Sequence, residues 1–194
     1  MRRTLIIMVK EPRPGRVKTR LGREIGMTTA AWWFRHQTRH LLRRLRDPRW
    51  DILLAAAPDA EGLRSRIWPA DLARAPQGRG DLGDRMARML RAAPNGPACV
   101  IGADIPGITQ LHIGEAFAAL GDHDAVFGPA PDGGYWLIGL KHPRRQPPDF
   151  FNGVRWSTEH ALSDTIATLP DHRIARITTL RDVDTADDLP MTRP

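Results

Sequence analysis

The chain has 194 residues, of which 41% are apolar and 26% are charged, a composition typical of one ordinary soluble domain. No apolar run exceeds about half a dozen residues, whereas a membrane-spanning helix needs roughly 20. The basic start also lacks the longer apolar stretch and cleavage site of an export signal. We therefore expect a cytoplasmic protein that forms one domain over residues 1–194 and has no membrane segment.

Basic residues outnumber acidic ones, with 29 Lys and Arg against 22 Asp and Glu and a net charge of +7. Such a balance is compatible with a polyanion partner. Almost all of these basic residues are arginines spread along the whole chain, however, which is more simply a bias in amino-acid usage. Aromatic residues are not interleaved with the basic ones, and no zinc-finger or RNA-recognition signature is present. A nucleic-acid-binding protein without catalysis is therefore the less favoured class.

Short apolar runs bounded by turn residues alternate with amphipathic segments along the chain. The runs predict strands over residues 4–9, 51–57, 98–102, 124–128, 136–140 and 174–178. The amphipathic segments predict helices over residues 27–46, 60–68, 81–93, 109–120 and 158–169. This alternation indicates an α/β fold with a mostly parallel sheet and helices on both faces. Ligands bind at the carboxyl ends of the strands in such folds.

The loop after the first predicted strand, residues 10–21, carries five positive charges, two prolines and a glycine. Gly15 allows a close approach of the backbone, while Lys18 and Arg20 can neutralise and clamp a triphosphate. The loop matches neither the Walker A pattern nor the dinucleotide-binding glycine pattern. Its composition is compatible with either a phosphate site or a solvated basic turn.

Two carboxylates lie where a divalent metal could be held. Asp104 lies two residues after the end of the predicted strand 98–102, and Asp184 lies in the acidic segment 182–189 near the C-terminus. Mg²⁺ prefers one or two carboxylates together with phosphate oxygens of the substrate. Both aspartates are equally compatible with caps of a turn or helix.

Two glycine-containing turns complete the candidate site. Gln77 and Gly78 precede the predicted helix 81–93, where a glutamine amide and exposed N–H groups could contact a nucleobase edge. Asp132, Gly133 and Gly134 allow a close approach of the chain to a ligand, and a hairpin turn explains them equally well.

Six motifs, taken together and in this order, resemble the domain of unknown function 2064 family. They are Lys-x-Pro-x-x-Gly-x-x-Lys-Thr-Arg-Leu (10–21), Gln-Gly-x-Gly-Asp-Leu-Gly-x-Arg-Met (77–86), Gly-x-Asp-Ile-Pro-Gly (102–107), Pro-x-x-Asp-Gly-Gly-Tyr-Trp-Leu-Ile-Gly-Leu (129–140), Trp-Ser-Thr (156–158) and Asp-Val-Asp-Thr-x-x-Asp-Leu (182–189). This family, also described as radical-SAM/selenodomain-associated transferase 1, is similar to the GT-A nucleotide-diphospho-sugar transferases. It is related to the 2-phospholactate guanylyltransferases.

The resemblance implies a single Rossmann-like GT-A domain that binds a nucleotide together with Mg²⁺ or Mn²⁺. The metal ligands it implies are Asp104 and Asp184. The nucleotide-binding residues it implies are Lys10, Gly15, Lys18, Arg20, Gln77 and Gly78. The acceptor-binding residues are Asp132, Gly133 and Gly134, with Trp156 as a candidate to line the same pocket.

The expected reaction is nucleotidyl transfer from a nucleoside triphosphate to a small phosphorylated or sugar acceptor, with Lys18 and Arg20 as catalytic residues. Such a reaction needs alignment of the reactants and neutralisation of the phosphate charge, which lysine, arginine and a carboxylate-held metal supply. Glycosyl transfer from a nucleotide-diphospho-sugar needs the same clamp, with Asp132 as a possible base. A nucleotide-holding partner subunit without activity is a further alternative.

Overall fold

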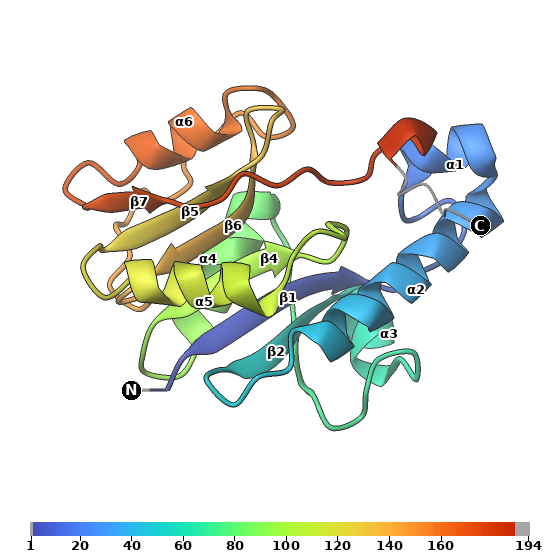
Figure 1. Ribbon diagram of the computed structural model, residues 1–194, viewed down its shortest axis with the longest axis horizontal. Coiled ribbons are helices and arrows are strands. Elements are labelled where there is room, and N and C mark those ends of the chain that lie inside the picture. Colours follow the sequence, from blue (N-terminus) through green and yellow to red (C-terminus); the bar gives the residue numbers. More distant parts are fainter. Residues whose placement is uncertain (1, 189–194) are drawn as a thin grey trace.

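The computed structural model of the protein describes residues 2–188 and contains a seven-stranded sheet in the order β3-β2-β1-β4-β6-β5-β7 (Figure 1). The strands are β1 (Thr4–Lys10), β2 (Asp51–Ala57), β3 (Ala73–Pro76), β4 (Ala98–Gly102), β5 (Ala125–Pro129), β6 (Tyr135–Leu140) and β7 (Ile174–Arg176). β6 runs antiparallel to its neighbours β4 and β5, and the other neighbouring strands pair in parallel. The predicted mostly parallel α/β fold is therefore confirmed, and the glycine turn between β5 and β6 closes an antiparallel hairpin.

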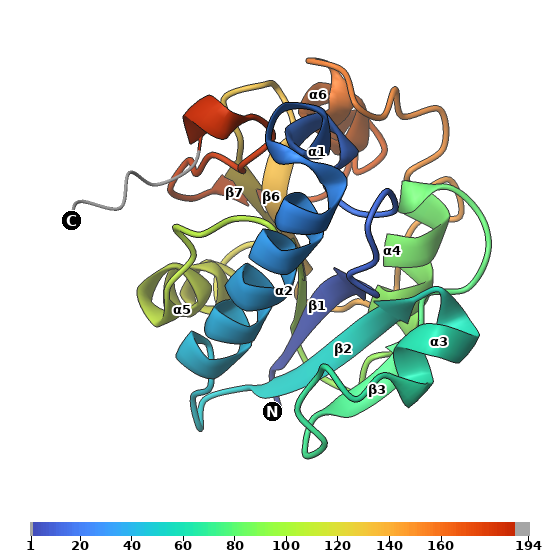
Figure 2. The same cartoon turned by 90° about the vertical axis from the view of Figure 1, so that its right-hand side faces the viewer.

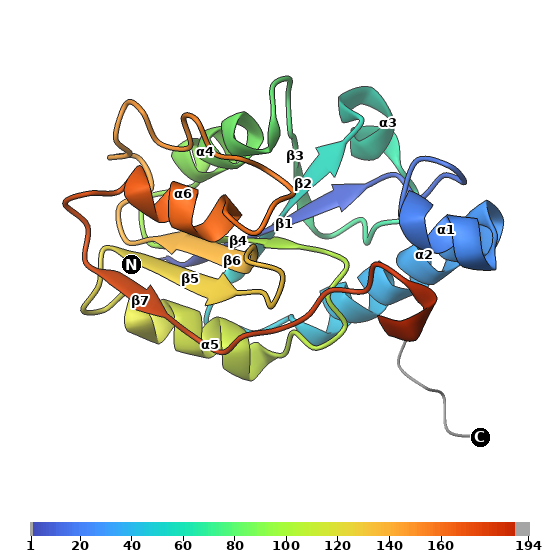
Figure 3. The same ribbon diagram turned by 90° about the horizontal axis from the view of Figure 1, so that it is seen from above.

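Helices cover both faces of this sheet, as Figure 3 shows. The helices on one face are α2 (Met27–Arg44) and α5 (Gln110–Ala119), and those on the other are α4 (Leu82–Ala92) and α6 (Ala161–Ala167). Successive residues of a strand point to opposite faces, so Leu5 and Ile7 pack with α2 and α5 whereas Ile6 packs with α4. No helix within residues 2–188 is long and apolar enough to cross a membrane.

Two elements of the structure are missing from the sequence prediction. β3 has the sequence Ala-Arg-Ala-Pro and lies at the edge of the sheet, where neither an apolar run nor a strict alternation is needed. α1 (Thr19–Ile25) directly precedes α2 and is separated from it by Gly26, whose φ of 91° breaks the helical path. The basic loop after β1 therefore leads into α1 and not directly into the longer α2.

Two predicted helices are shorter in the structure by three or more residues. The helix predicted over residues 60–68 is α3 (Asp59–Arg64), because the Arg74 guanidinium binds the carbonyls of Ser65 and Trp68 at 2.6 and 3.0 Å and holds the following segment in turns. The helix predicted over residues 158–169 begins only at Ala161, since the Thr158 hydroxyl donates to the Arg155 carbonyl at 2.7 Å and accepts from His160 N–H at 3.2 Å, which holds residues 158–160 in turns.

The chain after β7 returns across the sheet to the region of α1, as Figures 1 and 2 show. Leu180 N–H donates to the Pro129 carbonyl at 3.1 Å, and the Trp136 indole donates to the Thr178 carbonyl at 2.9 Å. Val183 is buried against Leu21, so the short helix η1 (Ala186–Asp188) ends up beside α1. This path carries the C-terminal aspartates to the loop that follows β1. The last residue of the 182–189 motif, Leu189, lies outside the described residues.

Candidate active site

A cleft of about 950 Å³ opens beyond the carboxyl ends of β1 and β4, which is where open α/β sheets bind ligands. The sequence-predicted residues that line it are Lys10, Lys18, Arg20, Gln77, Asp104, Asp132, Gly134, Trp156 and Asp184. Gly15, Gly78 and Gly133 belong to the same loops but are not among the lining residues. The structure thus brings together candidate residues from segments that are far apart in the sequence.

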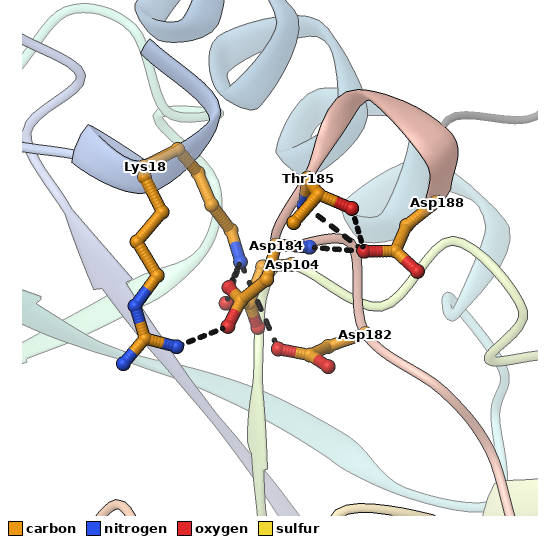
Figure 4. Close-up of polar contacts among 7 residues, drawn as sticks. Lys18, Asp104, Asp182, Asp184, Thr185 and Asp188 are labelled. Atoms are coloured by element: carbon orange, nitrogen blue, oxygen red, sulfur yellow. Dashed lines mark hydrogen bonds and ion pairs between the residues drawn. The ribbon is translucent and has the colours of Figure 1, made fainter. Parts of the chain in front are cut away.

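Lys18 lies at the centre of the charged side of this cleft. Its Nζ is 2.7 Å from an Asp104 carboxylate oxygen, 3.0 Å from Asp184 and 3.9 Å from Asp182. Figure 4 shows the ammonium group pointing between these carboxylates. Arg20 adds a second ion pair to Asp184 at 3.0 Å. Asp104 and Asp184, the two predicted metal ligands, therefore face the same position, and in this structure a lysine ammonium occupies it.

The charges of this cluster change the proton affinities of its members. Burial lowers the pKa of Lys18, but attraction and hydrogen bonds from Asp104 and Asp184 outweigh burial, so the net shift is upward. Burial also raises the pKa of the Asp182 carboxyl to about 6, and repulsion from the negative charge of Asp184 adds to this rise. Lys18 is thus a firmly charged cation among three carboxylates.

Backbone hydrogen bonds hold Asp184 in place. The Asp188 carboxylate accepts from Asp184 N–H at 3.2 Å and from Thr185 N–H and Oγ at 3.0 and 2.8 Å. The Asp188 pKa is lowered, chiefly by the hydrogen bond from the Thr185 hydroxyl. The sequence is compatible with Asp184 as a cap, whereas in the structure Thr185 directly precedes η1 and Asp188 supplies the carboxylate that fixes this turn. Its contacts leave the Asp184 side chain free to face Lys18.

The carboxylates fit a divalent metal that binds together with a phosphate compound. Asp104 and Asp184 already contact one cation from two separate segments, and Mg²⁺ typically takes one or two carboxylates plus substrate phosphate oxygens. Within residues 2–188, no group of three or more Asp, Glu, His or Cys side chains is arranged to hold a metal. The donor set therefore suits a shared site better than a site built from protein ligands alone.

Gln77 has a different role from the predicted contact with a nucleobase. Its side chain is 2% exposed, and its amide nitrogen donates to the carbonyls of Val9 at 3.1 Å and Ala55 at 2.8 Å. Both amide donors are therefore used to join β1 to β2 beneath the cleft, so they are not available to a base. Sequence spacing gave no sign of this, because the acceptors are backbone carbonyls of distant segments.

Three cations line both the main cleft and a second cavity of about 420 Å³ beside it: Lys10, Arg16 and Arg85. Gly78 lines this second cavity, and its N–H donates to an Asp59 carboxylate oxygen at 3.1 Å. The sequence prediction did not select Arg16 or Arg85 individually, although Arg85 is a named residue of the 77–86 motif and Arg16 is one of the five positive charges counted in the loop 10–21. Their place at the junction gives a polyphosphate more than one positive partner.

The opposite side of the cleft is built from turns that pack on each other. Asp132 accepts from Gly134 N–H at 2.9 Å, which stabilises the hairpin turn. Gly133 has a φ of 84°, and a Cβ atom there would lie 2.1 Å from the Glu159 carbonyl oxygen. The Trp156 indole N–H donates to Asp81 at 3.3 Å. This side presents an aromatic face and carboxylates, and it is a candidate acceptor surface.

Comparison with solved structures identifies three informative similarities. A protein of Desulfovibrio desulfuricans G20, whose assignment as a nucleotide-diphospho-sugar transferase is provisional, is 31% identical with a TM-score of 0.85, covering 95% of this chain and 84% of that one. A CMP:2-keto-3-deoxy-manno-octonic acid synthetase complexed with CTP is 9% identical with a TM-score of 0.60, covering 96% and 95% of the two chains. Rv0371c of Mycobacterium tuberculosis H37Rv, complexed with manganese, is 13% identical with a TM-score of 0.53, covering 97% and 96%. The last two show a common fold only.

No protein of curated function matches the sequence. A protein-family profile described as "Uncharacterized protein conserved in bacteria (DUF2064)" matches residues 41–158. This range contains Gln77, Asp104, the Asp132–Gly134 turn and Trp156, but neither the loop around Lys18 nor Asp184. The profile covers more than half of the chain and agrees with the close structural match over nearly its full length. The chain belongs to the domain of unknown function 2064 family.

Proposed function

We propose that this protein is a divalent-metal-dependent transferase that uses a nucleoside triphosphate and transfers its nucleotidyl group to a small phosphorylated or sugar acceptor. The observation that carries the proposal is that the Lys18 Nζ atom lies in the cleft at 2.7 Å from an Asp104 carboxylate oxygen and 3.0 Å from an Asp184 carboxylate oxygen. Charge neutralisation and alignment are the main requirements of phosphoryl chemistry, and this cluster supplies groups for both.

In nucleotidyl transfer, an acceptor oxygen forms a bond to the α-phosphorus while the bond from that phosphorus to the bridging oxygen breaks and pyrophosphate leaves. Lys18 and Arg20 would hold the phosphates and neutralise the charge that develops on the leaving group. Arg16 and Arg85 line the same cleft and would hold the outer phosphates. A divalent metal held by Asp104 and Asp184 would supply further neutralisation at the phosphate oxygens.

The acceptor would bind on the side of the cleft formed by Asp132, Gly134 and Trp156. Trp156 offers a flat apolar face of the kind that packs on sugar rings, and the carboxylate of Asp132 can accept hydrogen bonds from hydroxyl groups. Among the fold relatives, one structure is a complex with CTP and another a complex with manganese, which supports a nucleotide and a divalent metal as ligands by analogy of fold.

Glycosyl transfer from a nucleotide-diphospho-sugar is the second candidate. It is favoured by the name of the relative from D. desulfuricans, which is 31% identical. The cation cluster would then stabilise a nucleoside diphosphate leaving group, and Asp132 would take the proton from the acceptor hydroxyl. The two candidates differ in the bond that breaks, so they require different donors.

The test is thermal stabilisation of the purified protein by GTP, CTP, UTP and ATP and by their diphospho-sugars, each with and without Mg²⁺ or Mn²⁺. A ligand at about 100 times its dissociation constant adds roughly 2.7 kcal/mol to the free energy of unfolding, which is a readable shift in melting temperature. Metal-dependent stabilisation by a triphosphate supports nucleotidyl transfer, and preference for a diphospho-sugar supports the second candidate.

The control for this test is Asp122→Asn, which removes one exposed carboxylate from the turn before β5, at the other end of the sheet. It should respond like the wild type, whereas Asp104→Asn should lose the metal-dependent part of the shift. Absence of any shift, together with salt-sensitive binding of nucleic acid that needs no metal, would overturn the proposal in favour of a nucleic-acid-binding protein.

A further inference from the structure

Lys18 is built into the structure as a buried cation. Its side chain is only 7% exposed, although it ends in a charged group at the edge of a large cleft. Its backbone has φ and ψ of 46° and 49° at the N-cap position that directly precedes α1, a conformation that non-glycine residues rarely adopt. The neighbouring Val17 is buried in the main core. The backbone of Lys18 is therefore held, while four carbon atoms of flexible side chain separate it from the ammonium group.

The ammonium group lies where one cation can contact both Asp104 and Asp184. Its distances to their oxygens, 2.7 and 3.0 Å, are those of direct charge-assisted hydrogen bonds. A divalent metal held by the same two carboxylates would need the same oxygens, and two cations so close together would repel each other strongly. Lys18 and a metal are therefore competitors for this position.

The cleft offers the Lys18 ammonium another set of partners once a phosphate compound binds. Lys18 lines the cleft together with Arg16, Arg20 and Arg85, so a polyphosphate that contacts these arginines would bring several negative oxygens within reach of the lysine. If the ammonium group moves to these phosphate oxygens, it stays paired, because phosphate oxygens replace the carboxylate oxygens as its partners. The vacated carboxylates then face the same phosphates, which matches the preference of Mg²⁺ for mixed carboxylate and phosphate ligands.

We propose that Lys18 fills the cation position between Asp104 and Asp184 in the ligand-free protein, moves to a phosphate group when a polyphosphate binds, and so makes binding of the divalent metal conditional on the polyphosphate. This inference rests on the proposed function, because it assumes that the two carboxylates hold a metal during the reaction. It assigns Lys18 a second role beyond phosphate binding, that of a positioning residue that sets the order in which substrate and metal enter. An order of this kind prevents the metal from occupying the site without substrate.

The experiment measures Mn²⁺ binding to the nucleotide-free protein by electron paramagnetic resonance of the free ion. The comparison is between the wild type, Lys18→Met and the charge-matched control Lys141→Met. Lys141 donates to the Gly121 carbonyl on the surface, away from the cleft. We expect Lys18→Met to bind Mn²⁺ at least about tenfold more tightly than the wild type, and Lys141→Met to bind like the wild type. Equal affinities for all three proteins, or no binding by Lys18→Met, would overturn the inference.

A second measurement covers the case in which Lys18→Met folds poorly because three carboxylates are left without their lysine. Lys18→Gln retains a hydrogen-bond donor at this position, and its melting temperature should rise with added Mn²⁺ alone, whereas that of the wild type should rise only when a triphosphate is also present. A wild type stabilised by Mn²⁺ alone to the same extent as the variant contradicts the inference. Failure of every triphosphate to stabilise the wild type would instead count against the proposed function, and the comparison with Mn²⁺ alone keeps the two failures distinguishable.

Discussion

Each side of the cleft is built from several segments, and different interactions hold these segments together on the two sides. On the carboxylate side, defined by Lys18, Asp104 and Asp184, the segments meet through ion pairs of 2.7 and 3.0 Å. On the turn side, defined by Gly133 and Trp156, they meet through close backbone packing and a neutral donor on a carboxylate. A charged ligand can replace one partner of an ion pair, whereas it cannot replace packed backbone. We conclude that the carboxylate side is suited to respond to substrate and the turn side to present a fixed surface to it.

The largest effect is expected from removing charge on the carboxylate side. Asp104→Asn keeps the shape of the side chain but removes one of the two carboxylates that face Lys18. Turnover with the triphosphate that stabilises the protein should fall by about 10²- to 10³-fold, the usual cost of losing one electrostatic group at a transition state. Steady-state kinetics with release of pyrophosphate would measure this. Activity within a few-fold of wild type would show that this side does not perform the chemistry.

The next effect is expected from disturbing the packing of the turn side. In Gly133→Ala, the added Cβ would lie 2.1 Å from the Glu159 carbonyl oxygen at a residue with a φ of 84°. The free energy of unfolding should fall by about 3 kcal/mol, from backbone strain and overpacking together. Gly153→Ala is the matched control, because Gly153 has a φ of 73° and no atom within 4 Å of the added Cβ. It should cost about 1 kcal/mol, and equal losses for the two variants in urea unfolding would refute the packing argument.

A smaller loss is expected beneath the cleft, where Gln77 joins β1 to β2. Gln77→Leu leaves the carbonyls of Val9 and Ala55 without their donor and should lower the free energy of unfolding by about 2 kcal/mol. The order of preference among GTP, CTP, UTP and ATP should not change, since the amide donors are already taken by these two carbonyls. Gln146→Leu removes two hydrogen bonds nearer the surface, one to the Ala87 carbonyl and one from the exposed Arg91 guanidinium, and should cost about 0.5 kcal/mol. A changed base preference in Gln77→Leu would restore the original prediction of a base contact.

The smallest effect is expected at the ion pair that fastens the loop before α6. Hydrogen bonds from the Arg155 side chain and then from its backbone N–H lower the pKa of Asp164 from its usual 3.8 to about 2. Because the folded pKa lies below the unfolded one, this carboxylate stabilises the folded state above about pH 4, and the stabilisation is lost as the pH falls towards 2. Urea unfolding should therefore show Asp164→Asn to be less stable than wild type at pH 7, with the difference shrinking below pH 4 and nearly gone at about pH 2. A difference that does not change with pH would mean that the ionic form of Asp164 is not what holds the loop.

The order and type of most elements, and the segments that meet at the cleft, could be predicted from the sequence. The strand predicted over residues 98–102 agrees with β4 (Ala98–Gly102), because a buried strand requires an unbroken apolar run that ends at a turn residue. Asp104 could be placed at the cleft for the same reason, since it follows such a strand. β3 escaped prediction because a short edge strand needs little burial on either face.

The partners of the individual polar side chains became apparent only in the folded chain. Lys18 and Asp184 are separated by 166 positions in the sequence and meet because the chain after β7 crosses back to α1. Gln77 turned from a candidate ligand contact into a link between strands, since its acceptors are carbonyls that no sequence pattern displays. Buried apolar positions recur with a local period along the chain, so they can be predicted from the sequence. The partner of a charged or amide group is instead set by whichever segment the fold brings within about 3 Å.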